Sequence, residues 1–337
     1  MSASTFQCLL VSEKPNRVFR REITRKSIAE LPPGELLIRV HFSSLNYKDA
    51  LSATGNKGVT RRYPHIPGVD AAGIVEDSQH PSFKVGDKVV VTGNDLGSNT
   101  WGGFSEFVRV PAEWAVPLPP SLTMKESMIY GTAGFTAALS LYKLMREGVK
   151  PADGKILVTG ATGGVGCLAV ALLATEGFST VAATGKMKEQ EFLKSLGASE
   201  VIERESVKDT THRPLLSGRW AGVIDTVGGE YLDSAIRSTK LEGTITTCGN
   251  VTGAELHTSI YPFILRGVNL LGIGSAFSPM DVRLEIWNRL ATSWKLPNLN
   301  LLHEDVSLRE LDNKIHLILE GKVRGRAVVN LSSEAPQ

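Results

Sequence analysis

The stretch GKILVTGATGGVG, residues 154–166, decides the fold of this chain. Its first half is a short apolar run, typical of a buried strand. Its second half is a glycine-rich turn that opens the apolar segment GGVGCLAVALLATEG, residues 163–177, which has the length and composition of a buried helix. A strand, such a turn and a helix in direct succession are the context that separates a dinucleotide-binding fingerprint from a chance match. The stretch therefore predicts the first βαβ unit of a dinucleotide-binding sheet.

The residues that follow extend this sheet. Five further short apolar runs are predicted as strands: STVAAT (179–184), SEVIE (199–203), GVIDTV (222–227), GTITTCG (243–249) and VNLLGIG (268–274). A helix is predicted over EQEFLKSLG, residues 189–197, between the first two of these runs. Strands that alternate with helices indicate a parallel sheet covered on both faces. Six strands in two halves match the doubly wound, Rossmann-type α/β fold.

The N-terminal part of the chain has a different pattern. Runs rich in Val, Ile and Phe, among them ELLIRVHFSSL (35–45) and DKVVVTG (87–93), are separated by Gly, Pro and Asn, which predicts a small β barrel or sandwich. The proline-rich segment 111–122 is predicted as an extended crossover out of this domain. Helices are expected over 279–294 and 307–322, and the last strand, RAVVNL (326–331), is expected to return to the first domain. We therefore expect a catalytic domain of residues 1–124 and 298–337 and a dinucleotide-binding domain of residues 125–297.

Composition excludes several classes of protein. The 337 residues are 42% hydrophobic and 21% charged, an ordinary globular mixture, and 37 Lys and Arg against 35 Asp and Glu give a net charge of +2. That charge offers no concentrated basic face for nucleic acid. No apolar run approaches the length of a membrane-spanning helix, and the N-terminus lacks the features of a secretory signal. Three scattered cysteines fit the reducing cytoplasm, where we expect the protein to be.

The end of the second strand indicates which nicotinamide coenzyme binds. NAD sites place an Asp or Glu about 20 residues after the glycine turn, where it binds the ribose hydroxyls. Here the strand ends in Thr184-Gly185-Lys186, and Lys188 follows. No carboxylate repels a 2′-phosphate at this point, and two lysines are close by. The sequence therefore favours NADPH over NADH, with surface solvation as the alternative explanation of the lysines.

The sequence resembles the zinc-free quinone oxidoreductase branch of the medium-chain dehydrogenase/reductase superfamily, and within it the acrylyl-CoA reductase-like group. The resemblance covers nearly the whole chain. YGTAGFTAAL (130–139) and YPFILRG (261–267) are rather specific to this group, whereas SSLNYKDAL (43–51), YPHIPGVDAAG (63–73), WGGFSEFVRVP (101–111) and VTGATGGVG (158–166) are shared more widely. The resemblance implies a GroES-like catalytic domain, a Rossmann-type coenzyme domain, a cleft between them and a homodimer.

Zinc chemistry is not expected. Zinc-dependent relatives use a Cys where this chain has Asn46, and a His-Glu pair where it has Val69 and Asp70. The soft and imidazole ligands of a catalytic zinc are therefore missing, and three scattered cysteines cannot make a four-cysteine structural site. Another electrophilic group must then stabilise the negative charge that develops after hydride transfer.

Three residues of the Asn-Tyr-Lys-Asp motif are the catalytic candidates. By resemblance the motif lines the cleft beside the nicotinamide. Asn46 can donate a hydrogen bond through its amide, Tyr47 can donate a hydrogen bond or a proton, and Asp49 can orient its neighbours. The alternative is a purely structural turn capped by Asn46 and Asp49. Tyr63 is a rival donor, for which packing is the favoured explanation.

The remaining candidates would hold the coenzyme. The turn should present backbone N–H groups to the pyrophosphate at the start of the following helix. By resemblance, further contacts come from the segment around Thr136, from the ends of the last two strands and from Arg326. The complete predicted set is Thr136, Thr162, Gly163, Gly164, Val165, Gly166, Thr184, Gly185, Lys186, Gly249, Asn250, Gly274, Ser275 and Arg326.

Three functions remain open from the sequence. The first is an NADPH-dependent reductase of activated alkenes, with acryloyl-CoA-like thioesters or enones as substrates. The second is an NADPH-dependent quinone oxidoreductase. The third is a non-catalytic NADPH-binding sensor, against which the intact Asn46, Tyr47 and Asp49 argue. The cations Lys57, Arg61 and Arg62, in the loop between the Asn-Tyr-Lys-Asp and IPGVD segments, are candidates for contacts with the phosphates of coenzyme A, with a solvated surface loop as the alternative.

Overall fold

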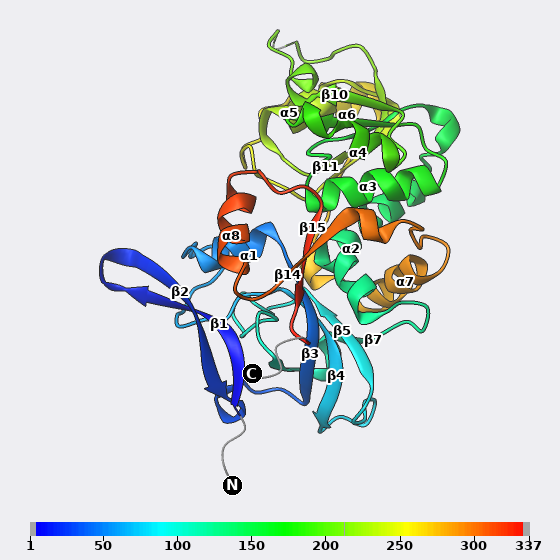
Figure 1. The fold of residues 1–337 in the computed structure, drawn as a ribbon. Coiled ribbons are helices and arrows are strands. Elements are labelled where there is room, and N and C mark those ends of the chain that lie inside the picture. Colours follow the sequence, from blue (N-terminus) through cyan, green and yellow to red (C-terminus); the bar gives the residue numbers. More distant parts are fainter. Residues whose placement is uncertain (1–4, 212, 333–337) are drawn as a thin grey trace. The chain divides into compact units, whose positions relative to one another are not determined.

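The computed structural model of the chain describes residues 5–211 and 213–332 (Figure 1). The chain divides into two compact units. The first comprises Met1–Thr132, Ala276–Thr292 and Asn298–Gln337, and the second comprises Ala133–Ser275 and Ser293–Pro297. Below they are called the first and the second unit.

The second unit is built on a six-stranded parallel sheet. Its strands, in chain order, are β8 (Ile156–Val158), β9 (Thr180–Thr184), β10 (Glu200–Glu203), β11 (Trp220–Asp225), β12 (Thr239–Thr247) and β13 (Asn269–Gly272). Their order in the sheet is β10-β9-β8-β11-β12-β13, and every neighbouring pair is parallel. This order reverses direction at β8, as a doubly wound dinucleotide fold requires. The Rossmann-type sheet predicted from the sequence is confirmed.

Helices follow the strands of this sheet. They are α3 (Gly164–Thr175), α4 (Gln190–Ser195), α5 (Gly229–Arg237) and α6 (Tyr261–Arg266). Helix α3 is buried from Gly166 to Leu173, which explains why its sequence is apolar on every side. Valine and isoleucine side chains from the strands fill the core beneath the helices, as in other parallel sheets that are covered on both faces.

The first unit contains a seven-stranded, mostly antiparallel sheet. Its strands are β3 (Leu36–Leu45), β4 (Asp70–Ser78), β5 (Lys88–Thr92), β6 (Phe107–Val110), β7 (Ala115–Pro117), β14 (His303–Val306) and β15 (Arg326–Asn330). The sheet runs β14-β15-β3-β4-β5-β7, and β6 also pairs with β3. Strand β15 pairs antiparallel with β3, so the predicted return of the last strand to the first domain is confirmed.

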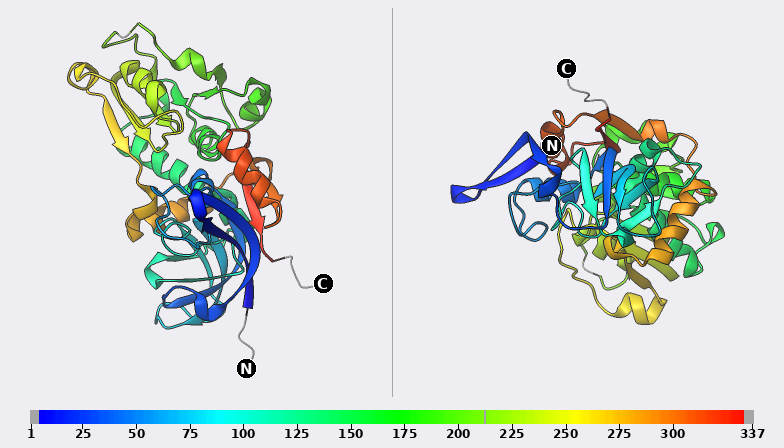
Figure 2. Two further views of the ribbon diagram at one scale, coloured as in Figure 1. Left: turned by 90° about the vertical axis from the view of Figure 1, so that its left-hand side faces the viewer. Right: turned by 90° about the horizontal axis from the view of Figure 1, so that it is seen from below.

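A long hairpin completes the β structure of the first unit. It consists of β1 (Thr5–Lys14) and β2 (Val18–Ser27), which pair over their whole length. Asn16 and Arg17 in the connecting turn both have positive φ, the conformation that a tight hairpin turn needs. The tip of the hairpin extends beyond the seven-stranded sheet in Figure 1 and in the right-hand view of Figure 2.

The other helices are α1 (Tyr47–Ala53), α2 (Met124–Arg146), α7 (Met280–Ala291) and α8 (Leu311–Leu319). Short 3-10 turns lie at 15–17, 28–30, 112–114, 151–153, 187–189, 204–207, 275–277 and 299–302. Helices α7 and α8 lie within the two predicted C-terminal helices, whereas α2 and the strand β14 were not predicted. Helix α2 is broken at Gly131, whose φ of +50° and ψ of −155° are not helical.

Two segments differ from the domain division expected from the sequence. Residues 276–292 belong to the first unit because the buried Arg283 donates to the backbone oxygens of Thr92 and Ala276 at 2.8 and 3.0 Å. Residues 125–132 belong to it because the polar network described below includes Thr132.

The proline-rich segment 111–122 is not entirely a crossover. It includes the short strand β7, which pairs with β5 at the edge of the sheet, where a proline costs no ladder hydrogen bond. Among the described residues no helix is both long and apolar enough to cross a lipid bilayer.

Candidate active site and coenzyme-binding turn

The Asn-Tyr-Lys-Asp motif forms the start of helix α1, directly after strand β3. Asn46 is extended, with φ of −121° and ψ of 161°, and Tyr47 is the first helical residue. Asp49 accepts a hydrogen bond from the Asn46 backbone N–H at 2.8 Å, which satisfies one of the free donors at the helix start. Its other oxygen accepts from the backbone N–H groups of Gly68 and Val69, at 3.1 and 2.8 Å. Asp49 thus ties α1 to the segment that leads into β4.

Asp49 is completely buried. Burial raises the pKa of its carboxyl to about 7, and the nearby charge of Asp70 adds to the increase, while the N–H donors oppose it. Asp49 can therefore hold a proton near neutral pH, unlike an ordinary surface carboxylate.

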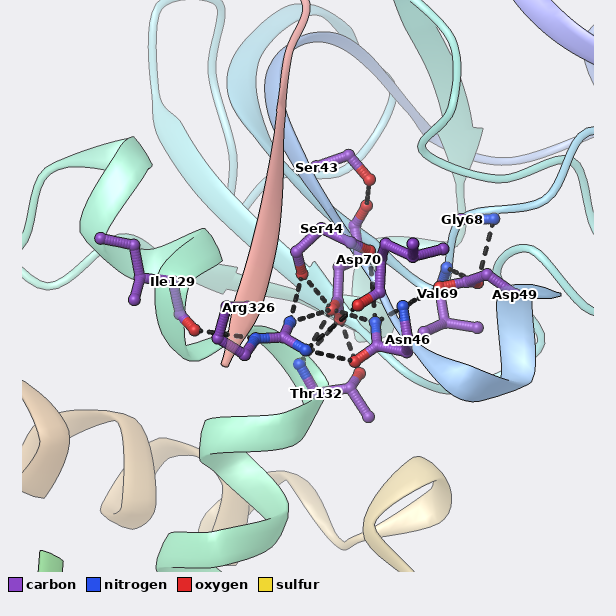
Figure 3. A network of polar contacts seen from close by, with 11 residues as sticks. Ser43, Ser44, Asn46, Asp49, Gly68, Val69, Asp70, Ile129, Thr132 and Arg326 are labelled. Atoms are coloured by element: carbon purple, nitrogen blue, oxygen red, sulfur yellow. Dashed lines mark hydrogen bonds and ion pairs between the residues drawn. The ribbon is translucent and has the colours of Figure 1, made fainter. Parts of the chain in front are cut away.

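Asp70, at the start of β4, is the centre of a buried polar network (Figure 3). One of its oxygens accepts from the Ser44 hydroxyl at 2.6 Å and from the Asn46 amide at 2.7 Å. The other accepts from the Thr132 hydroxyl at 2.6 Å, and the Thr132 backbone N–H also points at the carboxylate. The break at Gly131 makes room for this arrangement, because a Cβ there would lie 2.5 Å from both Asp70 Oδ2 and Ser44 Oγ.

Arg326, the first residue of β15, completes the network. Its side chain is 2% exposed, and its Nη2 lies 3.7 Å from Asp70 Oδ2. The guanidinium donates hydrogen bonds to the backbone oxygens of Ile129 and Leu45, to Asn46 Oδ1 at 3.1 Å and to Ser44 Oγ at 2.8 Å. Every one of these partners belongs to the first unit. These contacts hold the side chain in the polar network of the first unit, and a contact of Arg326 with the coenzyme stays a prediction.

These residues do not fit a catalytic zinc ion. At the positions where zinc-dependent relatives have ligands, this chain has an amide, an aliphatic side chain and one carboxylate, and the guanidinium of Arg326 already neutralises that carboxylate. Within residues 5–211 and 213–332, no group of three His, Cys, Asp or Glu side chains is arranged to hold a metal ion. The chemistry of the site must therefore be built from hydrogen-bond donors.

The three catalytic candidates differ in what their side chains can still do. The Asn46 amide nitrogen already faces Asp70 Oδ2, the Ser44 backbone oxygen and Asp49 Oδ2, at 2.7, 3.2 and 3.4 Å. Asn46 and Asp49 are thus both committed to contacts within the protein. Tyr47 is half-buried, and its hydroxyl makes no hydrogen bond to any residue that the structure describes. Tyr47 is the candidate with an uncommitted donor.

The glycine turn has the geometry that its sequence predicts. Gly160 has a φ of +60°, and Gly163 directly precedes helix α3. A Cβ at Gly166 would lie 2.3 Å from the Gly160 carbonyl oxygen, so only glycine allows the helix to pack this closely on the turn. The buried Asp225 supports the turn from β11: its carboxylate accepts from the Thr159 hydroxyl at 2.7 Å and from the Gly228 N–H at 3.1 Å. The N–H groups at the start of α3 are thus positioned for a pyrophosphate.

Other predicted coenzyme residues lie together in pairs. The hydroxyls of Thr162 and Thr184 are 3.1 Å apart, and Thr184 Oγ1 also accepts from the Lys186 backbone N–H at 3.0 Å. Thr136 donates to the Ser275 hydroxyl at 2.8 Å.

The predicted coenzyme residues at the ends of β12 and β13 differ in how closely they are packed. Gly249 packs so closely against Thr226 that a Cβ at position 249 would lie 1.9 Å from the Thr226 carbonyl oxygen. A Cβ at Gly274 would meet nothing within 4 Å. The neighbouring Asn250 is exposed.

One cation near the end of β9 was missed in the sequence. Arg204 follows the last residue of β10, and because Glu203 pairs with Thr184 in the parallel sheet, Arg204 lies beside Gly185. A Cβ at Gly185 would stand 3.1 Å from Arg204 Cδ and Nε. The signal available in the sequence was the position of this arginine directly after the third strand, SEVIE. Arg204 and Lys186 are thus two cations at the strand end where NAD sites of this fold place a carboxylate.

Comparisons with known proteins agree with this architecture. Residues 32–120 match the alcohol dehydrogenase GroES-like domain family, and residues 164–290 match the zinc-binding dehydrogenase family. Bacillus subtilis YhfP, named "Putative quinone oxidoreductase", is 45% identical over 90% of this chain and 93% of its own. Acrylyl-CoA reductase AcuI of Ruegeria pomeroyi is 42% identical over 92% of this chain and 94% of its own.

Two solved structures have nearly the same fold. The Salmonella enterica yhdH oxidoreductase, in complex with NADP, superposes with a TM-score of 0.93 at 39% identity and covers 96% of this chain and 99% of its own. YhfP with NAD bound superposes with a TM-score of 0.94 at 43% identity and covers 98% of this chain and 100% of its own. The chain belongs to the quinone oxidoreductase and acrylyl-CoA reductase group of the medium-chain dehydrogenase/reductase family of oxidoreductases.

Proposed function

We propose that this protein is an NADPH-dependent reductase that transfers a hydride to an activated alkene, with an acryloyl-CoA-like 2-enoyl thioester or an enone as substrate. The observation that carries the proposal is the buried network of Asp70, Arg326 and Asn46, which occupies the positions of a catalytic zinc site. Tyr47, whose hydroxyl has no partner among the described residues, directly follows Asn46 in the chain. Two relatives above 40% identity support the oxidoreductase class, and one of them is named an acrylyl-CoA reductase. A quinone oxidoreductase is the second candidate, because the other relative carries that name.

The mechanism follows from the donors in the first unit. Bound NADPH supplies a hydride, which an acryloyl thioester accepts at its β-carbon. The thioester oxygen becomes negative, and a proton is then needed at the α-carbon. We assign to Tyr47, in the first turn of α1, the hydrogen bond or proton that is donated to the reacting group. Asn46 and Asp49 fix that turn through the Asn46 N–H to Asp49 hydrogen bond, so we assign them a positioning role.

Coenzyme preference gives the first prediction. We expect NADPH to bind at least about tenfold more tightly than NADH, a difference of about 1.4 kcal/mol, because Arg204 and Lys186 lie where a carboxylate would repel the 2′-phosphate. Arg204→Ala, or Lys186→Ala combined with Lys188→Ala, should erode the preference by weakening NADPH and leaving NADH unchanged. Fluorescence titration of both coenzymes measures these affinities.

Lys194→Ala is the matched control for this titration, since it removes an exposed lysine of α4 that pairs with Glu191. It should leave the ratio of the two affinities unchanged. Equal affinity of the wild-type protein for NADPH and NADH would contradict the assignment, and the NAD-bound structure of YhfP makes that comparison necessary.

The proposed activity is tested by following NADPH absorbance with four substrates: acryloyl-CoA, crotonyl-CoA, a simple enone and a small neutral quinone. Acryloyl-CoA should give the highest kcat/KM. A protein that reduces only the quinone would establish the second candidate instead, and one that binds NADPH but reduces none of the four would be the non-catalytic sensor.

The loop between the Asn-Tyr-Lys-Asp motif and β4 supports a second prediction. Lys57 is not available there, because its Nζ lies 2.6 Å from Glu13 Oε2 and 4.8 Å from the centre of the Tyr63 ring. Arg61 and Arg62 are exposed, with no partner among the described residues. We therefore assign the coenzyme A phosphates to these two arginines.

Replacing Arg61 and Arg62 by Ala should raise KM for acryloyl-CoA by about tenfold, with kcat unchanged and quinone turnover unaffected, because the lost contact is made equally in ground and transition states. Lys84→Ala with Lys88→Ala removes two exposed cations elsewhere in the first unit and serves as the control. An equal rise in KM for both substrates, or for the control, would reject the assignment.

We also propose a homodimer that forms through β13. This strand is at the edge of the six-stranded sheet, where, among the strands that the structure describes, it pairs with β12 alone. Ile264 and Leu265 of the adjacent α6 are 62% and 58% exposed, and an open apolar edge of this kind invites pairing. Light scattering should give twice the chain mass of 36.4 kDa.

Ile264→Lys should shift the dimer toward the monomer, whereas Leu241→Lys, at another exposed leucine of the same unit, should not. A wild-type monomer at micromolar concentration would disprove the dimer. The cytoplasm is the proposed location, in keeping with three free cysteines.

A further inference from the structure

Next to the proposed coenzyme site lies a set of side chains that neither the turn nor the catalytic motif accounts for. Glu205, in the 3-10 turn after β10, accepts a hydrogen bond from the Arg204 Nε at 3.2 Å. The same carboxylate oxygen accepts from the Tyr231 hydroxyl of α5 at 2.5 Å. Its other oxygen lies 3.3 Å from Lys208 Nζ. A single carboxylate thus joins Arg204 to a tyrosine of a different helix.

This arrangement differs from an ordinary surface ion pair. Arg204 and Glu205 are both more than half exposed, and such a pair is worth little by itself. Tyr231, however, is only 4% exposed, and Lys208 lies over its ring at 4.7 Å. The buried tyrosine therefore fixes the position of the carboxylate, and Lys208 neutralises its charge.

Which nitrogen of the Arg204 guanidinium is bound to Glu205 determines how the side chain can bind an anion. Glu205 accepts from the Nε of the guanidinium, and among the described residues none forms a hydrogen bond or ion pair with its two terminal nitrogens. These two nitrogens form the fork that binds the oxygens of a phosphate in two parallel hydrogen bonds. The aliphatic part of the side chain lies against Gly185, at the end of the strand that meets the adenosine ribose.

We propose that Glu205, fixed by Tyr231, is a positioning residue that holds the Arg204 guanidinium ready for the 2′-phosphate of NADPH, and so determines how strongly the enzyme selects NADPH over NADH. The inference rests on the proposed NADPH dependence. Long arginine side chains lose conformational freedom when they bind a ligand, and a side chain that is already ordered loses less.

Adenosine 2′,5′-bisphosphate and 5′-AMP isolate the contribution of the 2′-phosphate, and calorimetry of the full-length protein measures both. Arg204→Ala should lower the affinity for the bisphosphate by about tenfold or more and leave 5′-AMP unchanged. Glu205→Ala should lower it by about three- to tenfold, again without an effect on 5′-AMP. Glu205→Gln keeps an oxygen that can accept from both Arg204 and Tyr231, so it should restore most of the affinity.

Two further variants separate positioning from charge. Tyr231→Phe keeps the Glu205 carboxylate and its charge but removes the hydrogen bond that fixes its position. This variant should weaken bisphosphate binding as Glu205→Ala does. Glu230→Ala is the matched control: it removes the other carboxylate that contacts Lys208, at 3.3 Å, without touching Arg204, and should change neither affinity.

The outcomes distinguish this inference from the proposed function. If the wild-type protein does not prefer the bisphosphate over 5′-AMP, the proposed NADPH dependence fails. If it does, but Glu205→Ala binds the bisphosphate as tightly as the wild type or more tightly, then Glu205 does not position Arg204 and the inference is overturned. A loss in Glu230→Ala equal to that in Glu205→Ala would overturn it as well, because the effect would then be one of charge alone.

Discussion

The Tyr47→Phe variant should reduce acryloyl-CoA with a kcat about 100-fold below that of the wild type, while its affinity for NADPH stays the same. The substitution removes only a hydroxyl from a half-buried ring at the start of α1, so the fold should be unaffected. Because Asn46 and Asp49 are occupied by contacts within the protein, neither of the other two catalytic candidates can replace the lost donor. Steady-state kinetics with a separate coenzyme titration measures the two effects.

Tyr63→Phe is the control for this experiment. Tyr63 belongs to the same unit, but its hydroxyl is already bound to the Ser52 backbone oxygen at 2.6 Å, and its ring packs against Phe19. The sequence left Tyr63 as a rival donor, and these contacts favour packing as its role. Removing its hydroxyl should change kcat by less than about threefold. A Tyr47→Phe enzyme with wild-type kcat, or a larger loss in Tyr63→Phe, would show that Tyr47 is not the donor.

The Arg326→Met variant should lose about 3–5 kcal/mol of unfolding free energy. Asp70 would then be a fully buried carboxylate without its counter-ion, and Asn46 and Ser44 would each lose a hydrogen bond. Equilibrium unfolding in urea measures the loss. Activity should fall with it, since the same network supports the start of α1.

Two further variants test whether the loss of stability in Arg326→Met comes from the buried ion pair. Lys322→Met, at an exposed lysine of the same segment, should cost less than about 0.5 kcal/mol. Combining Arg326→Met with Asp70→Asn removes both charges and should recover part of the lost stability, because the uncompensated charge is the main cost. A loss below about 1 kcal/mol for Arg326→Met would mean that water reaches Asp70 and that the network is not the buried ion pair described above.

Much of the coenzyme-binding unit was predictable from local sequence. A strand, a glycine turn and a helix are consecutive in the chain, so the fingerprint at 154–166 is visible without any knowledge of distant residues. The same holds for the strands that follow and for the helix expected over 189–197. Helix α2 was missed because the glycine at 131 interrupts its pattern, and there the backbone leaves the helical conformation.

Tertiary structure alone decided the composition of the two sites. Asp70 and Arg326 are far apart in the chain, and only the pairing of β15 with β3 brings the arginine to the carboxylate. The expected contact of Arg326 with the coenzyme stays a prediction, whereas its contacts with Ser44, Asn46 and Asp70 follow from this pairing alone. Arg204 reaches the end of β9 only through the parallel register of β10, and Lys57 is occupied by a glutamate of the β1–β2 hairpin. The sequence by itself determined the family, the sheet and the phosphate-binding turn, because these depend on neighbouring residues. Pairing between strands decided which charged side chains form ion pairs and which hydrogen-bond donors have no partner among the described residues. No local sequence pattern specifies these contacts.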